Sequence, residues 1–252
     1  MACCLSEIAL FDVSQETARS FCATSVFMTD LSTWTPRPRP GGVALTGTTV
    51  RLEPLNWDAH EQGLFAVVGG KENARLWAHV SVGPYVDPEM FREEFEKTRT
   101  ANGWETMVIR DVRSRAIFGM FSFMRIREPH GSVEIGCVVF GYALQRTSKA
   151  TEGLLLMARH VFDDLGYRRY EWKCDDKNAA SMRAAKRFGF TYEGTFRNDS
   201  VQKCCNRDTA WFSITDAEWP SIRATLDAWL APQNFDADGT QIQTLEEVRG
   251  YS

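Results

Sequence analysis

The sequence lacks an excess of basic residues, because its 252 residues include 29 lysines and arginines against 33 aspartates and glutamates, for a net charge of −4. Domains that bind nucleic acids usually carry a basic excess or a basic stripe, so we expect no nucleic-acid partner. It also lacks any apolar run approaching the ~20 residues that a membrane-spanning helix requires, so we expect no membrane partner. A chain of this length suits one large domain or two small ones.

Metal-binding and disulfide patterns are missing as well. The seven cysteines include no CxxC pair, which leaves a zinc site without support, and we expect no metal. Their odd number and irregular spacing make a poor disulfide framework, which favours a reducing compartment. Glu7 and Asp12 interrupt the apolar stretch at the N-terminus, where a signal peptide would also need a positive region. We therefore expect a cytoplasmic protein.

Two familiar nucleotide-binding motifs are also absent. The sequence has no GxxxxGK[ST], which argues against a P-loop NTPase, and no GxGxxG after a strand, which argues against a Rossmann dinucleotide site. Any phosphate-bearing ligand must therefore be held in another way.

The first 46 residues differ in composition from the rest. Three prolines between residues 36 and 40 exclude a helix or a central strand, so this stretch predicts an extended arm. We expect residues 1–27 to be loose and residues 28–46 to pack on the domain, since Trp34 favours a buried position. The domain itself spans residues 47–231, and the acidic residues 232–252 are expected to form a loose tail.

Hydrophobic periodicity predicts an α/β (α+β) domain. Expected strands cover residues 48–55, 104–110, 116–126, 133–140, 168–174, 190–203 and 207–215, and expected helices cover residues 57–68, 87–102, 150–165, 178–188 and 216–230. This order indicates one mixed sheet that is antiparallel in its first half. The helix at 150–165 should be a crossover between parallel neighbours.

The loop from Gln145 to Ala150 delivers the chain to the start of that crossover helix. Unpaired N–H groups and the positive end of the helix dipole point the same way there, which suits a pyrophosphate. Arg146 and Lys149 add positive charge, while Thr147 and Ser148 add hydroxyl donors. An ordinary polar loop before a capped helix would look the same.

Beyond these physical features, the region from about residue 28 to 230 resembles the GNAT superfamily of acyl-CoA-dependent N-acetyltransferases, closest to its RimJ/RimL-like branch. The resemblance is carried by Glu134–Gly136, Ala143–Thr147, Ala150–Glu152, Leu165–Cys174, Asn178–Ser181, Arg187–Phe190, Asn206–Ser213 and Glu218–Pro220, with Thr29–Pro40 at the N-terminal end. It implies a single GNAT domain with a mostly antiparallel sheet, splayed between its fourth and fifth strands, and helices on both faces.

The resemblance also implies acetyl-CoA as co-substrate and a set of residues that hold it. The pantetheine arm would pair with the end of the fourth strand, at Cys137, Val138, Val139 and Phe140. The family's pyrophosphate pattern Q/R-x-x-G-x-G/A falls on Gln145, Arg146, Thr147, Ser148, Lys149 and Ala150. Ser148 stands where glycine is usual, which favours weaker binding rather than none, since its backbone N–H can still donate.

Catalytic roles carry over in the same way. Ser181 would protonate the departing thiolate and Asn178 would hold the pantetheine amide, with helix capping as the alternative role of Asn178. Two carboxylates, Glu134 and Asp199, are candidates for the base. Relatives often carry His where Cys137 stands; a covalent role for this thiol is the lesser alternative to a buried small side chain.

The expected function is transfer of an acetyl group from acetyl-CoA to a primary amine of a small molecule by direct attack. A protein N-terminus is an alternative acceptor. Two rival functions are a GNAT-fold enzyme recruited to other chemistry on natural products and a non-catalytic acyl-CoA-binding module. We expect a monomer or a homodimer.

Overall fold

The computed structural model describes residues 30–250. The chain forms one compact unit from Pro36 onward. Residues 30–35 belong outside that unit and hold a turn in which the Trp34 N–H donates to the Leu31 carbonyl. The expected loose segment 1–27 lies outside the described residues.

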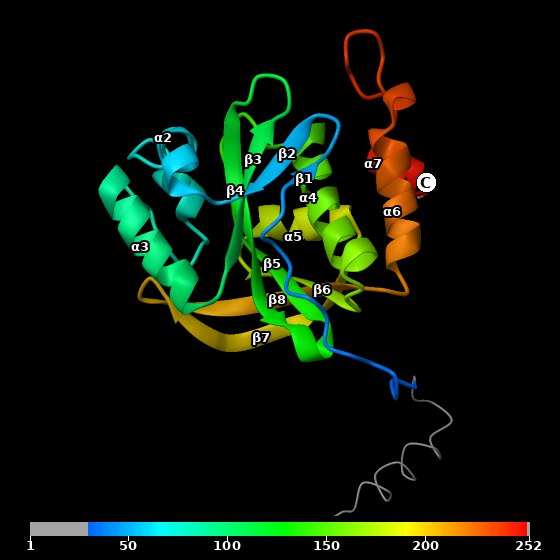
Figure 1. Cartoon of the computed structure of the whole chain (residues 1–252), viewed down its shortest axis with the longest axis horizontal. Helices are drawn as coiled ribbons and strands as arrows, with labels where there is room; N and C mark the ends of the chain where they lie inside the picture. The colour runs from blue at the N-terminus through cyan, green and yellow to red at the C-terminus, as the bar shows by residue number, and fades with distance from the viewer. Residues whose placement is uncertain (1–29, 251–252) are drawn as a thin grey trace, which may run out of the picture. The chain divides into compact units, whose positions relative to one another are not determined.

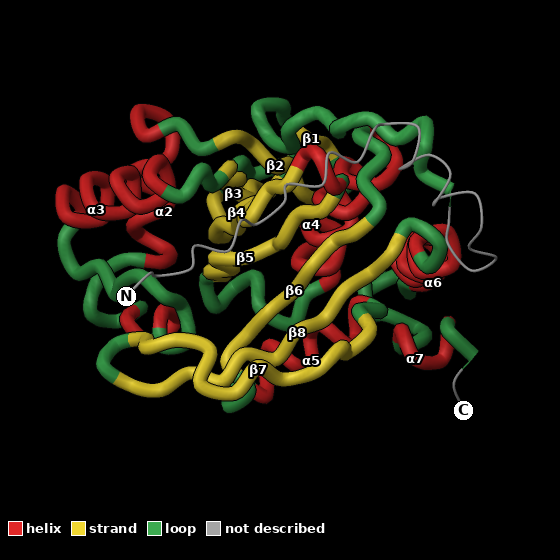
Figure 2. Tube along the Cα trace, turned by 90° about the horizontal axis from the view of Figure 1, so that it is seen from below, coloured by secondary structure: helices red, strands yellow, loops and turns green. Residues whose placement is uncertain are grey.

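Eight strands of the described chain form a single sheet (Figure 2). They are β1 (Leu45–Thr46), β2 (Val50–Pro54), β3 (Glu105–Asp111), β4 (Ile117–Arg127), β5 (Ser132–Phe140), β6 (Arg169–Asp175), β7 (Thr191–Gln202) and β8 (Cys205–Thr215), in the spatial order β1-β2-β3-β4-β5-β6-β8-β7. Every neighbouring pair is antiparallel except β5 and β6, which run parallel. The prediction of a mixed, mostly antiparallel sheet is confirmed.

Helices cover both faces of this sheet (Figure 1). The longer ones are α2 (Trp57–Val68), α3 (Pro88–Ala101), α4 (Ser148–Arg159), α5 (Ala179–Phe188) and α6 (Trp219–Leu230), and shorter segments are η1 (Ala74–Trp77), η2 (Glu128–His130), η3 (His160–Asp164), η4 (Pro232–Asn234) and α7 (Leu245–Val248). One buried cluster lies beneath α2 and α3 and a larger one beneath α4, α5 and α6.

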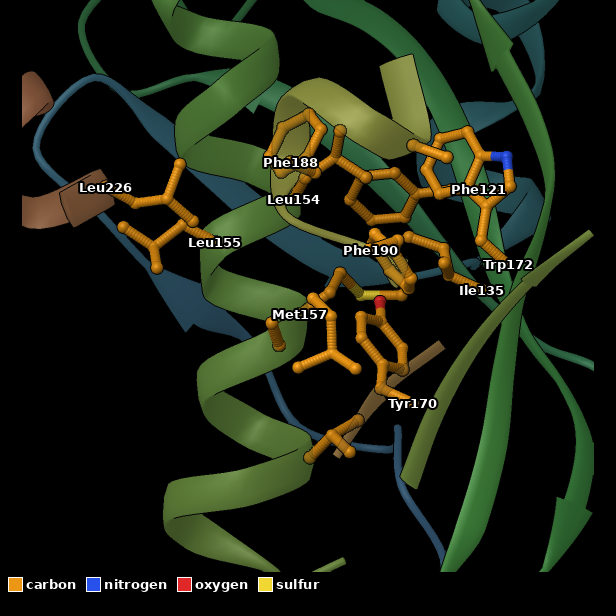
Figure 3. Packing of buried hydrophobic residues seen from close by; sticks show 14 of the residues in the cluster. Phe121, Ile135, Leu154, Leu155, Met157, Tyr170, Trp172, Phe188, Phe190 and Leu226 are labelled. Atoms are coloured by element: carbon orange, nitrogen blue, oxygen red, sulfur yellow. The ribbon is translucent and has the colours of Figure 1, made fainter. Parts of the chain in front are cut away.

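Local sequence explains where the two helices nearest β5 and β6 begin and end. Thr147 caps α4 by accepting a hydrogen bond from the Ala150 N–H, and Asn178 caps α5 by accepting one from the Ser181 N–H. Gly189 ends α5 in the left-handed region at φ 98°. Leu154 and Met157 of α4 then point toward Phe188 and Tyr170, whereas Leu155 points toward Leu226 of α6 (Figure 3).

The parallel pairing between β5 and β6 stops halfway. Residues Ser132–Ile135 pair with Arg169–Trp172, and no pairing of these strands continues beyond them in the described chain. A bulge on the β4 side of β5 falls at the same point, where Cys137 takes a positive φ of 46°. The expected splay is therefore present, and the gap that it leaves between β5 and β6 is next to the first residues of α4 and α5.

The proline-rich arm from Pro36 lies along the ends of β3 and β4. Arg39 binds the carboxylates of Glu105 and Glu128, each at 2.9 Å, and donates to the Gly103 carbonyl. The Tyr167 hydroxyl donates to the Pro38 carbonyl at 3.0 Å. These polar contacts, rather than apolar burial, connect residues 36–39 to the domain.

Two expectations differ from the structure at the C-terminal end. The last long helix begins at Trp219, three residues later than the periodicity predicts, because Glu218 accepts hydrogen bonds from Thr215 across the preceding turn. The segment beyond Phe235 is not loose as far as residue 250, since α7 has a capping box at Thr244 and Leu245 is buried in the main core.

Candidate active site

A cavity of about 1330 Å³ occupies the opening between β5 and β6. It collects residues from β5, from the loop before α4, from α5 and from β7. The predicted site residues along its walls are Glu134, Cys137, Val138, Phe140, Gln145, Arg146, Thr147, Ala150, Asn178, Ser181 and Asp199. One cavity thus unites side chains that are up to 65 positions apart in the sequence.

Glu134 is the most unusual ionisable group in this cavity. It is only 2% exposed, and its Oε2 lies 3.2 Å from Lys173 Nζ and 3.7 Å from Arg125 Nε. Burial disfavours the carboxylate more strongly than these two cations favour it, so the pKa of Glu134 is raised to about 7. A carboxyl group with such a pKa can accept a proton at neutral pH.

Gly136 leaves room for this carboxyl group. A Cβ at position 136 would lie 2.9 Å from Glu134 Oε1 and would also collide with the sulfur of Met124. A larger residue at this position would therefore have to shift the Met124 side chain, the Glu134 carboxyl group or both.

Asn178 and Ser181 face the cavity from the first turn of α5. Asn178 uses its Oδ1 to cap the helix, accepting from the Ser181 N–H at 3.1 Å, which leaves its amide nitrogen as a donor. Trp172 Nε1 donates to Ser181 Oγ at 3.0 Å. The Ser181 hydroxyl also forms a hydrogen bond with the Cys174 side chain, which lines the same cavity.

The loop before α4 is shaped by its own side chains. Gln145 donates to the Phe140 carbonyl at 2.9 Å, and Arg146 takes a positive φ of 64°. The Thr147 hydroxyl donates to the Leu144 carbonyl at 2.7 Å, so it is used within the loop and is not the ligand donor we expected. The first N–H groups of α4 have no acceptor within the helix.

Three of the expected cofactor residues are placed away from the cavity wall. The side chain of Val139 belongs to the core under α2 and α3, which leaves only its backbone for a ligand. Ser148 and Lys149 do not line the cavity. The Lys149 ammonium pairs with Asp111 at 2.5 Å and lies over the Phe118 ring, so its charge is engaged there.

Cys137 and Asp199 lie in contrasting surroundings. Burial raises the pKa of the Cys137 thiol to about 12, which keeps it protonated and argues against the covalent role. Asp199 is exposed, on a part of β7 where the pairing register with β8 shifts. Of the two candidate bases, only Glu134 is held in a desolvated position.

A further wall of the cavity was not anticipated residue by residue. It comes from η1 with the loop after it and from the β7–β8 hairpin, and includes Arg75, His79, Ser81, Lys203 and Arg207. The two segments touch, because Lys203 Nζ donates to the Trp77 carbonyl at 2.7 Å. No sequence motif marks these residues.

The aromatic side chains of Trp77, Tyr85 and Phe123 are buried in the core. Tyr142, by contrast, is 55% exposed and lines the cavity. Within residues 30–250, no group of three or more His, Cys, Asp and Glu side chains is arranged to hold a metal ion. The described helices include none whose length and apolarity would let it cross a membrane.

Comparison with known proteins agrees with this architecture. Residues 49–191 match the family model described as an acetyltransferase (GNAT) domain. A GCN5-related N-acetyltransferase from Brucella melitensis is 41% identical, with a TM-score of 0.82 over 86% of this chain and 98% of that one. A probable acetyltransferase of the GNAT family from Chromobacterium violaceum is 37% identical, with a TM-score of 0.72 over 77% and 96%. No curated protein matches the chain significantly.

Proposed function

Since the chain belongs to the GNAT acetyltransferase family, we propose that it transfers an acetyl group from acetyl-CoA to the primary amine of a small molecule. One observation carries the proposal. The cavity between β5 and β6 holds a buried carboxyl group whose pKa is about 7, a serine hydroxyl with a hydrogen to donate, and the amino end of a helix.

The residues present fit acetyl-CoA, which supplies the acetyl group as a thioester when it is bound. The first N–H groups of α4, with Arg146, would hold the pyrophosphate. The edge of β5 from Cys137 to Phe140 has no pairing with β6 in the described chain and would bind the pantetheine arm through its backbone. Asn178 would contribute its free amide nitrogen to the same arm.

Glu134 is assigned the role of general base. An ammonium group cannot attack a carbonyl carbon, so the acceptor must first lose a proton, either directly to Glu134 or through a water molecule. Burial raises the pKa of Glu134, so this carboxylate has enough affinity for a proton to take one from the acceptor. Lys173 and Arg125 keep this pKa from rising further, because both favour the ionised form of Glu134.

Ser181 is assigned the role of proton donor to the sulfur that leaves. Its hydroxyl is oriented by the Trp172 indole, which occupies one acceptor position on Oγ. Its hydrogen, which the Cys174 sulfur accepts in this structure, would turn to the leaving sulfur when acetyl-CoA is bound. The proposed location of the reaction is the cytoplasm, where the free and exposed thiols of Cys204 and Cys205 would stay reduced.

Release of free CoA from acetyl-CoA, measured with a panel of small primary amines, tests the proposal. We expect turnover by the parent protein and a loss of roughly 100-fold or more in Glu134→Gln. Glu171→Gln is the matched control, because Glu171 is equally buried beside Glu134 but binds Arg127 and Arg169 instead of lining the cavity. Its negative charge contributes to the raised pKa of Glu134, so we expect this variant to keep its turnover at high pH and to shift its pH profile to lower pH.

Other results would replace the proposal. Binding of CoA without turnover of any amine would identify an acyl-CoA-binding module. Acetylation confined to peptide N-termini would move the acceptor to proteins. If the chain neither binds nor consumes acetyl-CoA, the cavity serves a different chemistry.

A further inference from the structure

The cavity is far more basic than the protein that contains it. Six Arg or Lys side chains line it: Arg75, Arg146, Lys173, Arg187, Lys203 and Arg207. Its only lining carboxylates among the described residues are Glu134 and Asp199. The whole chain, by contrast, has a net charge of −4. Cations concentrated in one cleft of an acidic protein indicate anionic ligand groups.

Part of this charge is explained by the proposed cofactor. Arg146 lies two residues before α4, and Arg187 Nη1 donates to the Thr151 hydroxyl in the first turn of that helix at 3.1 Å. Both therefore lie at the end of the cavity where phosphates would bind. Lys173 is paired with Glu134, and Lys203 donates to the Trp77 carbonyl.

Arg75 and Arg207 remain, and they come from the other wall. Arg75 belongs to η1 and Arg207 to β8, two regions that the Lys203–Trp77 hydrogen bond holds together. Within residues 30–250, neither guanidinium forms an ion pair with a carboxylate. Arg207 donates to the Gln202 side chain, but its Nε is buried and has no hydrogen-bond partner. The nearby Asp175 is already engaged by His79 and by the Lys177 N–H.

From this arrangement we infer that the acceptor amine carries a carboxylate or phosphate group, which Arg75 and Arg207 bind while the amine lies at Glu134. The inference rests on the proposed acetyl transfer and specifies its substrate class. A guanidinium fork suits both anions, and a buried donor left without a partner is costly unless a ligand satisfies it. A polyamine would meet like charge on this wall.

The strand register indicates how far apart the amine and the anionic group of such an acceptor should be. Glu134 is level with Glu171 of β6, whereas Thr209 is level with Asp175 and Arg207 lies two residues further along β8. This separates the backbones of Glu134 and Arg207 by about 20 Å, at roughly 3.3 Å per residue. The side chains of both residues shorten the gap, so the anionic group should lie several bonds from the amine.

A set of matched amines tests the inference in the acetyl-CoA assay. γ-Aminobutyrate, γ-aminobutyramide and putrescine present an amine at a similar distance from a negative, a neutral and a positive group. We expect kcat/KM to be roughly 10- to 100-fold higher for γ-aminobutyrate than for γ-aminobutyramide, and lowest for putrescine. Phosphoethanolamine compared with ethanolamine shows whether phosphate or carboxylate is preferred.

Variants then assign the preference to the two arginines. Arg75→Gln and Arg207→Gln should raise KM for the anionic amine while leaving kcat and the CoA dissociation constant nearly unchanged, and Arg207→Lys should recover part of the loss. Arg75→Glu should shift the preference towards putrescine. Arg113→Gln, on an exposed turn outside the cavity, is the control.

The inference and the proposed function fail in different ways. If no amine is acetylated, acetyl transfer itself is wrong. If amines are acetylated with equal efficiency whatever their charge, acetyl transfer stands and the anionic acceptor is wrong. A weakened affinity for CoA in both Arg75→Gln and Arg207→Gln, with an unchanged acceptor KM, would assign the two arginines to the cofactor and overturn the inference.

Discussion

Glu134 combines nearly complete burial with two cationic neighbours, and this balance gives a defined dependence on pH. Its pKa of about 7 means that the carboxyl group is protonated, and unable to accept a proton, below neutral pH. We therefore expect kcat/KM to rise with pH through about 7. Glu134→Gln should lose this limb in a pH–rate profile and keep only the rise at higher pH that belongs to the free amine.

Asp199→Asn is the companion variant for that profile. Asp199 is exposed, so we expect its replacement to leave the limb near pH 7 in place. Loss of the limb in Asp199→Asn, together with its survival in Glu134→Gln, would exchange the roles of the two carboxylates.

Ser181 allows a separate prediction about the leaving group. Ser181→Ala should lower kcat by about 100-fold, the low end for a general acid, because a thiol leaves readily and water can substitute. The CoA dissociation constant should change little. Ser221→Ala, an exposed serine on α6, is the matched control. An unchanged kcat in Ser181→Ala would show that this hydroxyl gives no proton to the sulfur.

At this scale the sequence predicts some site residues and misses others for a physical reason. Glu134, Asn178 and Ser181 lie in contiguous motifs that resemble those of a known family, and the structure places all three at one cavity. Arg75 and Arg207 line the same cavity from segments more than 130 residues apart, and no local pattern connects them. Nor does the loop sequence reveal that Asp111, 38 residues earlier, engages Lys149.

Among the elements, α4 is tied to the start of the sheet by one buried side chain. Glu152 accepts hydrogen bonds from the N–H groups of Thr48, Thr49 and Val50 and from the Thr49 hydroxyl, across about a hundred residues of sequence. Gly47 permits this approach, since a Cβ there would collide with the Glu152 carboxylate. Glu152 thus fixes the amino end of α4, which lies at the cavity, against the segment Thr48–Val50.

Removing that carboxylate should destabilise the fold. Glu152→Ala removes the acceptor of three N–H groups, of which that of Val50 is buried, and a buried group left without an acceptor costs roughly 1–3 kcal/mol. We expect a clear fall in the urea midpoint with little change in slope. Glu94→Ala, on the exposed face of α3, should stay within about 0.5 kcal/mol of the parent. Equal midpoints for both variants would contradict the anchoring role.

The long elements were predictable because their periodicity extends over seven residues or more. The strand at 133–140 and the helix at 178–188 lie within a residue of β5 and α5. In contrast, β1 has two residues, η1 four and α7 four, too few for a period to emerge. The burial of α7 depends on its contact with α6. This is a tertiary contact, which the local acidic sequence does not predict.

For the molecule as a whole, a ligand that binds only the folded chain must raise its melting temperature. CoA at 100 times its dissociation constant would add about 2.7 kcal/mol by mass action. We expect a shift of several degrees in the parent and a smaller one in Arg146→Glu, with the difference between them greatest at low salt, because salt screens the attraction that Arg146 contributes. No shift in the parent at millimolar CoA would contradict the placement of a CoA site in this cavity.

The interruption between β5 and β6 also leaves two strand edges inside the sheet rather than at its rim. Amides of Ser132–Ile135 are enclosed by neighbours on both sides, whereas from Cys137 to Phe140 only β4 holds the strand. Hydrogen exchange should therefore divide β5 into a slow half and a fast half, because the second half can open without unfolding the first. A molecule bound in the gap would supply the hydrogen bonds that β6 does not. Hydrogen exchange of the amides from Cys137 to Phe140 would then become slow.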